Sequence, residues 1–314
     1  MLSLLLLSSC HKDEGVDPSI AGIAVANSDF QVLEDAAVRG GVVDILSNKN
    51  PNPASGGNYT VFAPNNAAFA RLGLNNATDL TSLQIPFLRN TLFYHVTGGI
   101  MASSALTPGS TTPSALGPVR RIIRRADGSL YVNGSKIIAT DIKASNGTVH
   151  AIDKVLLATG GNIVESAIAL QTAQVFVKSE LTFLVEAVVY ANLAGTLSGP
   201  GPFTVFAPTD QAFKDLGVQL GVPMNQPRDI RQLPMSLVRD VLLNHTLSGA
   251  SFSSELPESS RLPNALGANL STGAFINGTM TVKGNGNAVP ANMVIPDVQC
   301  TNGVVHVIDR VLLP

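Results

Sequence analysis

The chain repeats itself, and this repeat constrains its fold more than any other feature of the sequence. Residues 60–73 read TVFAPNNAAFARLG and residues 204–217 read TVFAPTDQAFKDLG, with nine of fourteen positions identical. Residues 146–157 and 302–313 are identical at nine of twelve positions. The two blocks recur in the same order, at spacings of 144 and 156 residues. A repeat of this length is domain-sized, so we predict a tandem duplication of a complete domain and not a solenoid.

Length and composition agree with two globular domains. The chain has 314 residues, of which 45% are hydrophobic and 13% charged, which is enough for two ordinary domains. Its net charge of -2 gives no broad basic field, so nucleic acid is not expected as a partner. No run reaches the ~20 consecutive apolar residues that a membrane-spanning helix needs. Two cysteines exclude a disulfide scaffold.

The first ten residues, MLSLLLLSSC, are a leucine run that ends in small residues and a cysteine. They resemble the end of a bacterial lipoprotein signal peptide, in which an aliphatic residue and two small residues precede the lipidated cysteine, here Cys10. The resemblance implies that residues 1–9 are a signal-peptide remnant and that residues 10–22 are a lipidated tether. The second cysteine, Cys300, is then expected to be a small buried residue.

The residues that follow Cys10 point to a location. Lys12 is followed by two acidic residues, and this pattern resembles a signal that sends some lipoproteins to the outer face of the outer membrane. We therefore expect an outer-membrane protein that is exposed at the cell surface. Its attachment to the membrane is expected to be through the lipid anchor only.

The order of apolar and turn-forming residues predicts an α+β fold for each copy. Apolar residues at helical spacing occupy 30–46 and the matching 181–197, which predicts opening helices. Residues 59–63 and 203–207 are aromatic and β-branched, as in short buried strands. Four Asn-Gly pairs, which begin at 133, 146, 277 and 302, predict tight turns in a β-rich last third. The predicted core and strand-end residues are Phe62, Pro64, Phe206 and Pro208.

With these blocks in place, the sequence resembles a known family. The pattern Thr-Val-Phe-Ala-Pro-x-x-x-Ala-Phe, followed by Asn-Gly-x-Val-His-x-Ile-Asp-x-Val-Leu, looks like the fasciclin-like domain over residues 23–158 and again over 161–314. The resemblance implies two tandem fasciclin-like domains, each a β-sandwich wedge with flanking helices. It also implies a role in cell-surface adhesion or matrix binding, without catalysis and without a cofactor.

The histidines invite a metal or catalytic interpretation, and their spacing argues against both. They form two repeat-related pairs, His95 with His245 and His150 with His306. No His-x-His, His-x-x-x-His or Cys-x-x-Cys spacing occurs, so we expect no metal site and predict that these side chains bond to backbone at strand ends. No nucleophile elbow, phosphate loop or dinucleotide fingerprint occurs either, which argues against an enzyme.

The second repeat block also carries one aspartate in each copy. Asp153 is followed by Lys154, and Asp309 is followed by Arg310. We expect the two aspartates to accept turn or cap hydrogen bonds, or to form surface ion pairs of small energy.

Two sets of residues are candidates for ligand binding. The element between the two blocks is Tyr94-His95 in the first copy and Asn244-His245 in the second. The other set is an arginine cluster that only the first copy carries, and two interpretations of it remain open. It is either a solvated hairpin that blunts an edge strand or a contact for anionic polysaccharide or lipid head groups. The cluster consists of Arg120, Arg121, Arg124 and Arg125.

These observations predict a binding protein. The leading hypothesis is a non-catalytic lipoprotein for cell-surface adhesion or for binding of extracellular polymers, with an extracellular polysaccharide or a matrix or cell-surface protein as partner. The alternative is an accessory glycan-binding component of an outer-membrane nutrient-uptake system. The two hypotheses share the fold and the lipid anchor and differ in what the bound polymer is for.

Overall fold

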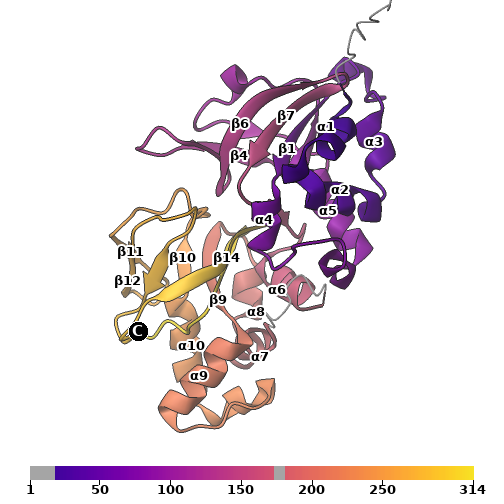
Figure 1. The fold of residues 1–314 in the computed structure, drawn as a ribbon. Coiled ribbons are helices and arrows are strands. Elements are labelled where there is room, and N and C mark those ends of the chain that lie inside the picture. The colour runs from indigo at the N-terminus through magenta and orange to yellow at the C-terminus, as the bar shows by residue number, and fades with distance from the viewer. Residues whose placement is uncertain (1–17, 173–180) are drawn as a thin grey trace, which may run out of the picture.

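The computed structural model describes residues 18–172 and 181–314. The sequence repeat becomes two domains of one design, which we call domain 1 (up to residue 158) and domain 2 (from residue 161) (Figure 1). In each domain the helices lie in the first half of the sequence with one strand, β1 (Tyr59–Pro64) or β9 (Phe203–Pro208), among them, and the other strands follow, as the sequence predicted. Cys10 and the predicted signal-peptide remnant lie outside the described residues.

Domain 1 packs its helices against a seven-stranded sheet in the order β2-β1-β7-β6-β5-β4-β3. Its helices are α1 (Ile20–Ala26), α2 (Gln31–Gly40), α3 (Val43–Ser47), α4 (Asn66–Ala70) and α5 (Ile85–His95). Its strands are β1 (Tyr59–Pro64), β2 (Val96–Gly98), β3 (Thr111–Thr112), β4 (Arg120–Arg124), β5 (Leu130–Val132), β6 (Ser135–Ala144) and β7 (Gly147–Ile152).

Domain 2 repeats this strand order as β10-β9-β15-β14-β13-β12-β11. One further strand, β8 (Leu157–Ala158), comes from the end of domain 1 and pairs in parallel with β14. The helices of domain 2 are α6 (Ile163–Thr172), α7 (Thr182–Tyr190), α8 (Ala194–Ser198), α9 (Asp210–Leu220) and α10 (Met235–Asn244). Its strands are β9 (Phe203–Pro208), β10 (Thr246–Ser248), β11 (Arg261–Pro263), β12 (Asn269–Thr272), β13 (Thr281–Lys283), β14 (Ala291–Cys300) and β15 (Gly303–Ile308).

Strand β1 lies inside domain 1 and is buried along its whole length. It pairs in parallel with β7 and antiparallel with β2. Val61 and Ala63 pack in the cluster formed with the helices, whereas Phe62 packs in a second cluster with Ile122 and Ile152 from the rest of the sheet. Because both faces of the strand are covered, residues 61–64 are all apolar and do not alternate with polar residues.

Helix α1 begins earlier than the sequence suggested. The hydroxyl of Ser19 caps it by accepting a hydrogen bond from the backbone N–H of Gly22. Ile20 and Ile23 are buried in the core of domain 1. The prediction that the tether extends to residue 22 is therefore wrong for residues 20–22, which the first helix buries.

The Asn-Gly pairs are not equivalent. Asn133 and Gly134 form the two-residue turn between β5 and β6, with Asn133 at a φ of 53°, as predicted. At 146 and 302 the predicted tight turns between paired strands are present, but they lie one residue earlier, over residues 145–146 and 301–302, because the glycine already begins the next strand.

The side chains of Asn146 and Asn302 also connect the first helices of each domain to its last turn. The side-chain oxygen of Asn146 accepts from the N–H of Ile20 at 2.9 Å, and its amide nitrogen donates to the carbonyl of Leu46 at 2.9 Å. Asn302 makes the same two bonds in domain 2, to Ile163 and Leu197. The sequence analysis predicted a turn at each of these asparagines and did not predict the hydrogen bonds of their side chains.

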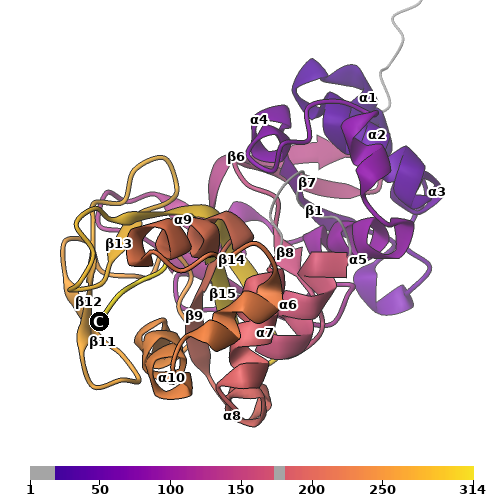
Figure 2. The same ribbon diagram turned by 90° about the horizontal axis from the view of Figure 1, so that it is seen from below.

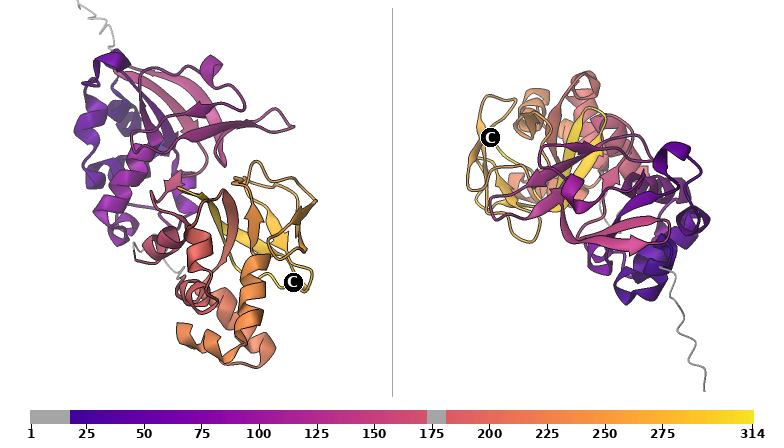
Figure 3. Two further views of the ribbon diagram at one scale, coloured as in Figure 1. Left: turned by 180° about the vertical axis from the view of Figure 1, so that it is seen from behind. Right: turned by 90° about the horizontal axis from the view of Figure 1, so that it is seen from above.

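The domains touch directly. Between β8 and α6 only a few residues connect them, and β8 lies beside β14 (Figure 2). The hairpin of β4 and β5 extends from domain 1 over domain 2, where Arg125 donates to the carbonyl of Ser254 at 2.8 Å (Figure 3). The second domain is thus held both by its covalent connection and by a contact surface.

Candidate functional site

The predicted core residues lie where the sequence placed them. Phe62 and Phe206 are 0% exposed, at the centres of β1 and β9. Pro64 and Pro208 are the last residues of these strands, and a capping side chain follows each. The side chain of Thr209, for example, accepts a hydrogen bond from the first turn of α9. The strand and core predictions are confirmed.

His95 and His245 occupy equivalent positions at the ends of α5 and α10. Nδ1 of His95 donates to the carbonyl of Thr91 at 2.7 Å, and Nε2 accepts from the N–H of Leu156 at 2.9 Å. His245 bonds in the same way to Val241 and Leu312. A ring nitrogen that accepts an N–H bond cannot carry a proton, so both rings are neutral. Burial lowers the pKa of each to about 4.

His150 and His306 have the opposite arrangement of donor and acceptor. Nδ1 of His150 accepts from the N–H of Asp141 at 3.2 Å, and Nε2 donates to the carbonyl of Met101 at 2.8 Å. His306 makes the same bonds to Asp297 and Ser251. Burial lowers the pKa of both rings. The prediction that the histidines bond to backbone is confirmed, with two tautomers fixed by position. Their predicted place at strand ends is wrong for His150 and His306, which lie inside β7 and β15.

Tyr94, His95, Asn244 and His245 are all 2% exposed or less, so the prediction that they contact a ligand is wrong for the folded domains. The hydroxyl of Tyr94 bonds to the side chain of Gln299 in domain 2 and accepts from Asn133 at 2.8 Å. Burial raises the pKa of Tyr94 to about 12. Tyr94 therefore contributes to the contact between domains.

The two aspartates of the second block accept hydrogen bonds, as predicted. Asp153 accepts from the N–H of Lys136 at 2.7 Å, and its other oxygen lies 3.9 Å from Arg71. Asp309 accepts from the backbone and side chain of Asn292 at 2.8 and 2.7 Å. Both carboxylates thus fix the start of the long strand beside them, β6 or β14.

Arg120 is 0% exposed and belongs to the interior of domain 1. Its guanidinium donates to the hydroxyl of Thr112 at 3.1 Å and to the carbonyl of Tyr94 at 2.8 Å. It also lies over the ring of Phe62, 4.8 Å from the ring centre. Burial lowers its pKa to about 10. Neither interpretation of the cluster holds for Arg120, because it joins α5 to the edge of the sheet.

Arg121 and Arg125 face domain 2. A guanidinium nitrogen of Arg121 lies 2.7 Å from the carboxylate of Glu255, and Arg125 pairs with Glu258. The rings of Phe252 and Phe275 lie under Arg121 and Arg125, at 4.6 and 3.9 Å.

Arg124 alone is exposed, and it bonds within its own hairpin to the carbonyl of Gly128. The solvated-hairpin interpretation fits Arg124 only. Arg121 and Arg125 make their side-chain contacts with domain 2.

Lys154 forms a buried ion pair across the interface, which the sequence did not reveal. Its ammonium lies 2.6 Å from Asp297, and it also donates to the carbonyl of Gly278 at 2.6 Å and to the hydroxyl of Ser253 at 3.2 Å. Burial alone would raise the pKa of Asp297, but Lys154 and a hydrogen bond from Ser253 hold that pKa below its ordinary value. We call Asp297, Ser253 and Gly278 the lysine site of domain 2.

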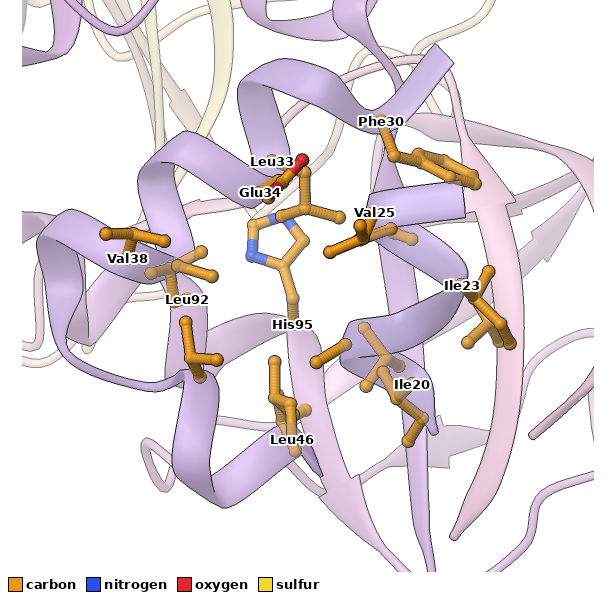
Figure 4. Close-up of a pocket in the computed structure, with 18 residues that line it drawn as sticks. Ile20, Ile23, Val25, Phe30, Leu33, Glu34, Val38, Leu46, Leu92 and His95 are labelled. Carbon is orange, nitrogen blue, oxygen red and sulfur yellow. The ribbon is translucent and has the colours of Figure 1, made fainter. Parts of the chain in front are cut away.

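An apolar pocket of about 90 Å³ lies between α1, α2 and α5 of domain 1. Figure 4 shows the ring of His95 among the lining side chains, with Leu92 and Val38 on one side of it and Val25 on the other. The matching pocket of domain 2 holds only about 30 Å³, because valines at 164 and 188 replace the alanines at 21 and 37. Even the larger pocket is smaller than the ~150 Å³ that accommodates benzene in an engineered cavity. It has the character of a packing gap.

Other chemistry is sparse in residues 18–172 and 181–314. Within those ranges no group of three or more His, Cys, Asp or Glu side chains could hold a metal ion. The same residues contain no helix long and apolar enough to cross a membrane. Cys300 is 6% exposed, and burial raises its pKa to about 11, which confirms it as a buried residue.

The fold and the repeated blocks define a chain of two fasciclin domains. A family model described as Fasciclin domain matches residues 28–158 and 179–314. These two matches cover most of the chain, and the chain therefore belongs to the fasciclin domain family. The α+β class and the tandem arrangement, expected from the sequence, are confirmed.

Named relatives match most of this chain over a part of their own length. Transforming growth factor-beta-induced protein ig-h3 of Sus scrofa is 31% identical over 267 residues, which cover 84% of this chain and 36% of that protein. Periostin of Homo sapiens is 27% identical over 267 residues, which cover 82% of this chain and 28% of that protein. The chain thus spans about a third of the length of these relatives.

Bacterial proteins match a single domain. Immunogenic protein MPB70 of Mycobacterium bovis is 27% identical over 154 residues, which cover 46% of this chain and 72% of that protein. Among solved structures, a FAS1 domain pair from the insect cell adhesion molecule Fasciclin I aligns over 94% of this chain and 96% of that chain, with a TM-score of 0.40 and 17% identity.

Proposed function

We propose that this protein is a non-catalytic lipoprotein for cell-surface adhesion or extracellular-polymer binding, attached to the outer membrane through Cys10. The observation that carries the proposal is how the polar side chains are used. The four histidines of the domains bond to backbone with both ring nitrogens, and all four arginines of the cluster bond inside domain 1 or to domain 2. Binding through the outer surface is the role that this arrangement supports.

Adhesion is tested with beads that carry the purified chain. We expect them to bind to immobilised extracellular polysaccharide or to matrix or cell-surface proteins more than bare beads do. Beads that carry the Phe62→Ala variant, whose core is disrupted, are the control for folded structure. Binding by the variant as strong as by the parent chain, or no binding by either, would contradict the proposal.

The lipid anchor has its own experiment. Cells grown with an alkyne fatty acid should label the protein, and Cys10→Ser should remove the label. Cys300→Ser is the matched control and should keep it, because Cys300 is buried in domain 2. Label that survives Cys10→Ser would refute the anchor without bearing on adhesion.

A second candidate function, glycan binding in a nutrient-uptake system, is favoured by one polar cavity. It has about 190 Å³ and lies between α9 and residues 286–289, with Asp215, Gln219 and Arg310 in its lining. A carboxylate, an amide and a guanidinium together match the hydroxyl groups of a sugar. On a glycan array Arg310→Ala should weaken any binding at this cavity, and Arg228→Ala, at an exposed site elsewhere in domain 2, should not.

A further inference from the structure

Domain 1 contains a counterpart of the lysine site of domain 2. Asp141 and Ser103 are the repeat equivalents of Asp297 and Ser253. The N–H of Ser103 donates to Asp141 at 2.8 Å, and the N–H of Ser253 donates to Asp297 at 2.6 Å. The two aspartates share a left-handed backbone, with φ of 58° and 71°. Each donates its own N–H to a histidine of the next strand, at 3.2 and 3.1 Å.

The two sites differ in occupancy. Asp297 binds Lys154 and is buried, whereas Asp141 is exposed. Among residues 18–172 and 181–314 no lysine or arginine pairs with Asp141. Hydrogen bonds from Ser103 lower the pKa of Asp141, so its carboxylate is charged at neutral pH. The carboxylate is thus oriented as in the occupied site before any cation binds.

The strand edge beside each site differs in the same way. In domain 2, Leu157 and Ala158 of β8 pair in parallel with Val298 and Gln299 of β14. Leu157 follows Lys154, which binds in the lysine site, by three residues. In domain 1 the corresponding residues of β6, Ile142 and Lys143, pair with β7 on one side. On the other side β5 pairs with β6 only at Ser135 and Lys136, so no strand in the described part of the chain pairs with Ile142 and Lys143. Beyond them the N–H of Ser145 donates to the carbonyl of Pro18 at 3.0 Å. An edge of this kind accepts an extended segment.

We infer that Asp141, Ser103 and the adjacent edge of β6 form a binding site for an extended, lysine-bearing segment of another polypeptide. The segment adds in parallel to the edge of β6 and places its ammonium on Asp141, as Lys154 does on Asp297. This deepens the proposed adhesive function by naming one class of partner.

A second copy of this chain is a poor partner. Domain 2 has Ser271 and Phe275 where domain 1 has Arg121 and Arg125, and domain 1 has Ala105 and Pro108 where domain 2 has Glu255 and Glu258. Both arginine–glutamate pairs would therefore be missing between copies.

At the end of domain 2, the backbone of Val311 and Leu313 is already hydrogen-bonded to a loop of the same domain. Asn287 accepts from the N–H of Leu313 and donates to the carbonyl of Val311, and Gly286 donates to the carbonyl of Leu313. These backbone groups are equivalent to those that begin β8 in domain 1. The end of domain 2 is therefore not available to pair with the edge of β6 in a second copy, so copies cannot join head to tail through this site. We assign the partner as a different polypeptide.

The experiment titrates a peptide with the sequence of residues 153–159, Asp-Lys-Val-Leu-Leu-Ala-Thr, into the isotope-labelled full chain and follows backbone amide resonances. We expect the amides of Ser103, Asp141 and Lys143 to shift and to saturate at millimolar peptide. The peptide with alanine in place of its lysine should bind about tenfold more weakly, as should Asp141→Asn protein with the parent peptide.

Asp127→Asn is the matched control, because Asp127 is an exposed carboxylate elsewhere on domain 1, bonded to Ser129. It should bind like the parent chain. Equal shifts with both peptides, or none, would overturn the inference. A further experiment compares Lys12→Ala with the parent chain when no peptide is present. If the same amide resonances differ between the two, the inference would also be overturned, because Lys12 of this chain would then already occupy the site. None of these outcomes decides the bead experiment, so the two proposals fail separately.

Discussion

The ammonium of Lys154 in domain 1 and the carboxylate of Asp297 in domain 2 lie 2.6 Å apart, and both side chains are about nine-tenths buried. No water is needed to satisfy the pair, because Ser253 and Gly278 bind the remaining polar atoms. A buried ion pair is not in itself evidence of high stability, since desolvation opposes the attraction. Removing one member is a different matter, because it leaves the other charge buried alone.

Lys154→Met should therefore lower the free energy of unfolding by about 3 to 5 kcal/mol. Adding Asp297→Asn should recover part of the loss, because asparagine is neutral and tolerates the left-handed backbone at this position. Chemical denaturation at neutral pH measures both. Lys143→Met, at an exposed position, is the control and should change little. A double variant no more stable than Lys154→Met would show that the uncompensated charge is not the cause.

Acid should destabilise the domains through His95 and His245. Burial lowers the pKa of each to about 4 in the folded protein, whereas about 6.5 is expected in the unfolded chain. The unfolded state then binds protons more readily, so this contribution is complete above pH ~6.5 and is lost as the pH falls toward 4. Its slope is at most ~1.4 kcal/mol per pH unit for each ring.

Two measurements check this pH dependence. Denaturation midpoints should fall as the pH is lowered from 7 to 4. Imidazole nitrogen resonances of the folded protein should show both rings neutral, with the proton on Nδ1, from pH 7 down to the onset of their titration near the pKa of about 4. A ring of His95 or His245 that titrates near pH 6.5 in the folded protein would contradict the assignment. Carboxylates such as Asp297, whose pKa is lowered, lose their own contribution only at more acidic pH.

Local pattern made most of the fold predictable. The TVFAP strands, the helix after each and the backbone-bonded histidines follow from residues close in sequence and from their repetition. The arginines were misplaced for a physical reason: Arg121 and Arg125 find their partners about 130 residues away, in the other copy. One signal was available. Arginines in one copy, and glutamates in the other copy at positions where the repeats differ, are complementary charges.

The core prediction has a direct test in each domain. Phe62→Ala and Phe206→Ala should each lower the free energy of unfolding by about 3 to 5 kcal/mol, because both rings are fully buried and pack against a histidine of the neighbouring strand. Val218→Ala is the control, since Val218 is 85% exposed. Thermal melting of the three variants gives the comparison. Similar melting temperatures for Phe62→Ala and Val218→Ala would refute the strand assignment.

Gly134 gives a second test of the interface, because it lies beside Asp297, the partner of Lys154. A side-chain carbon added there would lie 1.9 Å from a carboxylate oxygen of Asp297, which is too close for any real contact. Gly134→Ala should therefore displace Asp297 from Lys154 and separate the domains. Small-angle scattering should show a larger radius of gyration, and denaturation should show two transitions instead of one.

Gly195→Ala is the matched control for that variant. Gly195 lies in α8 with open space at its side-chain position, so alanine should be neutral or stabilise the helix by up to ~1 kcal/mol. A compact, singly cooperative Gly134→Ala protein would mean that Asp297 can move without loss of docking. The ion pair would then be incidental to the interface, and the arginine–glutamate pairs of Arg121 and Arg125 would have to hold the domains together.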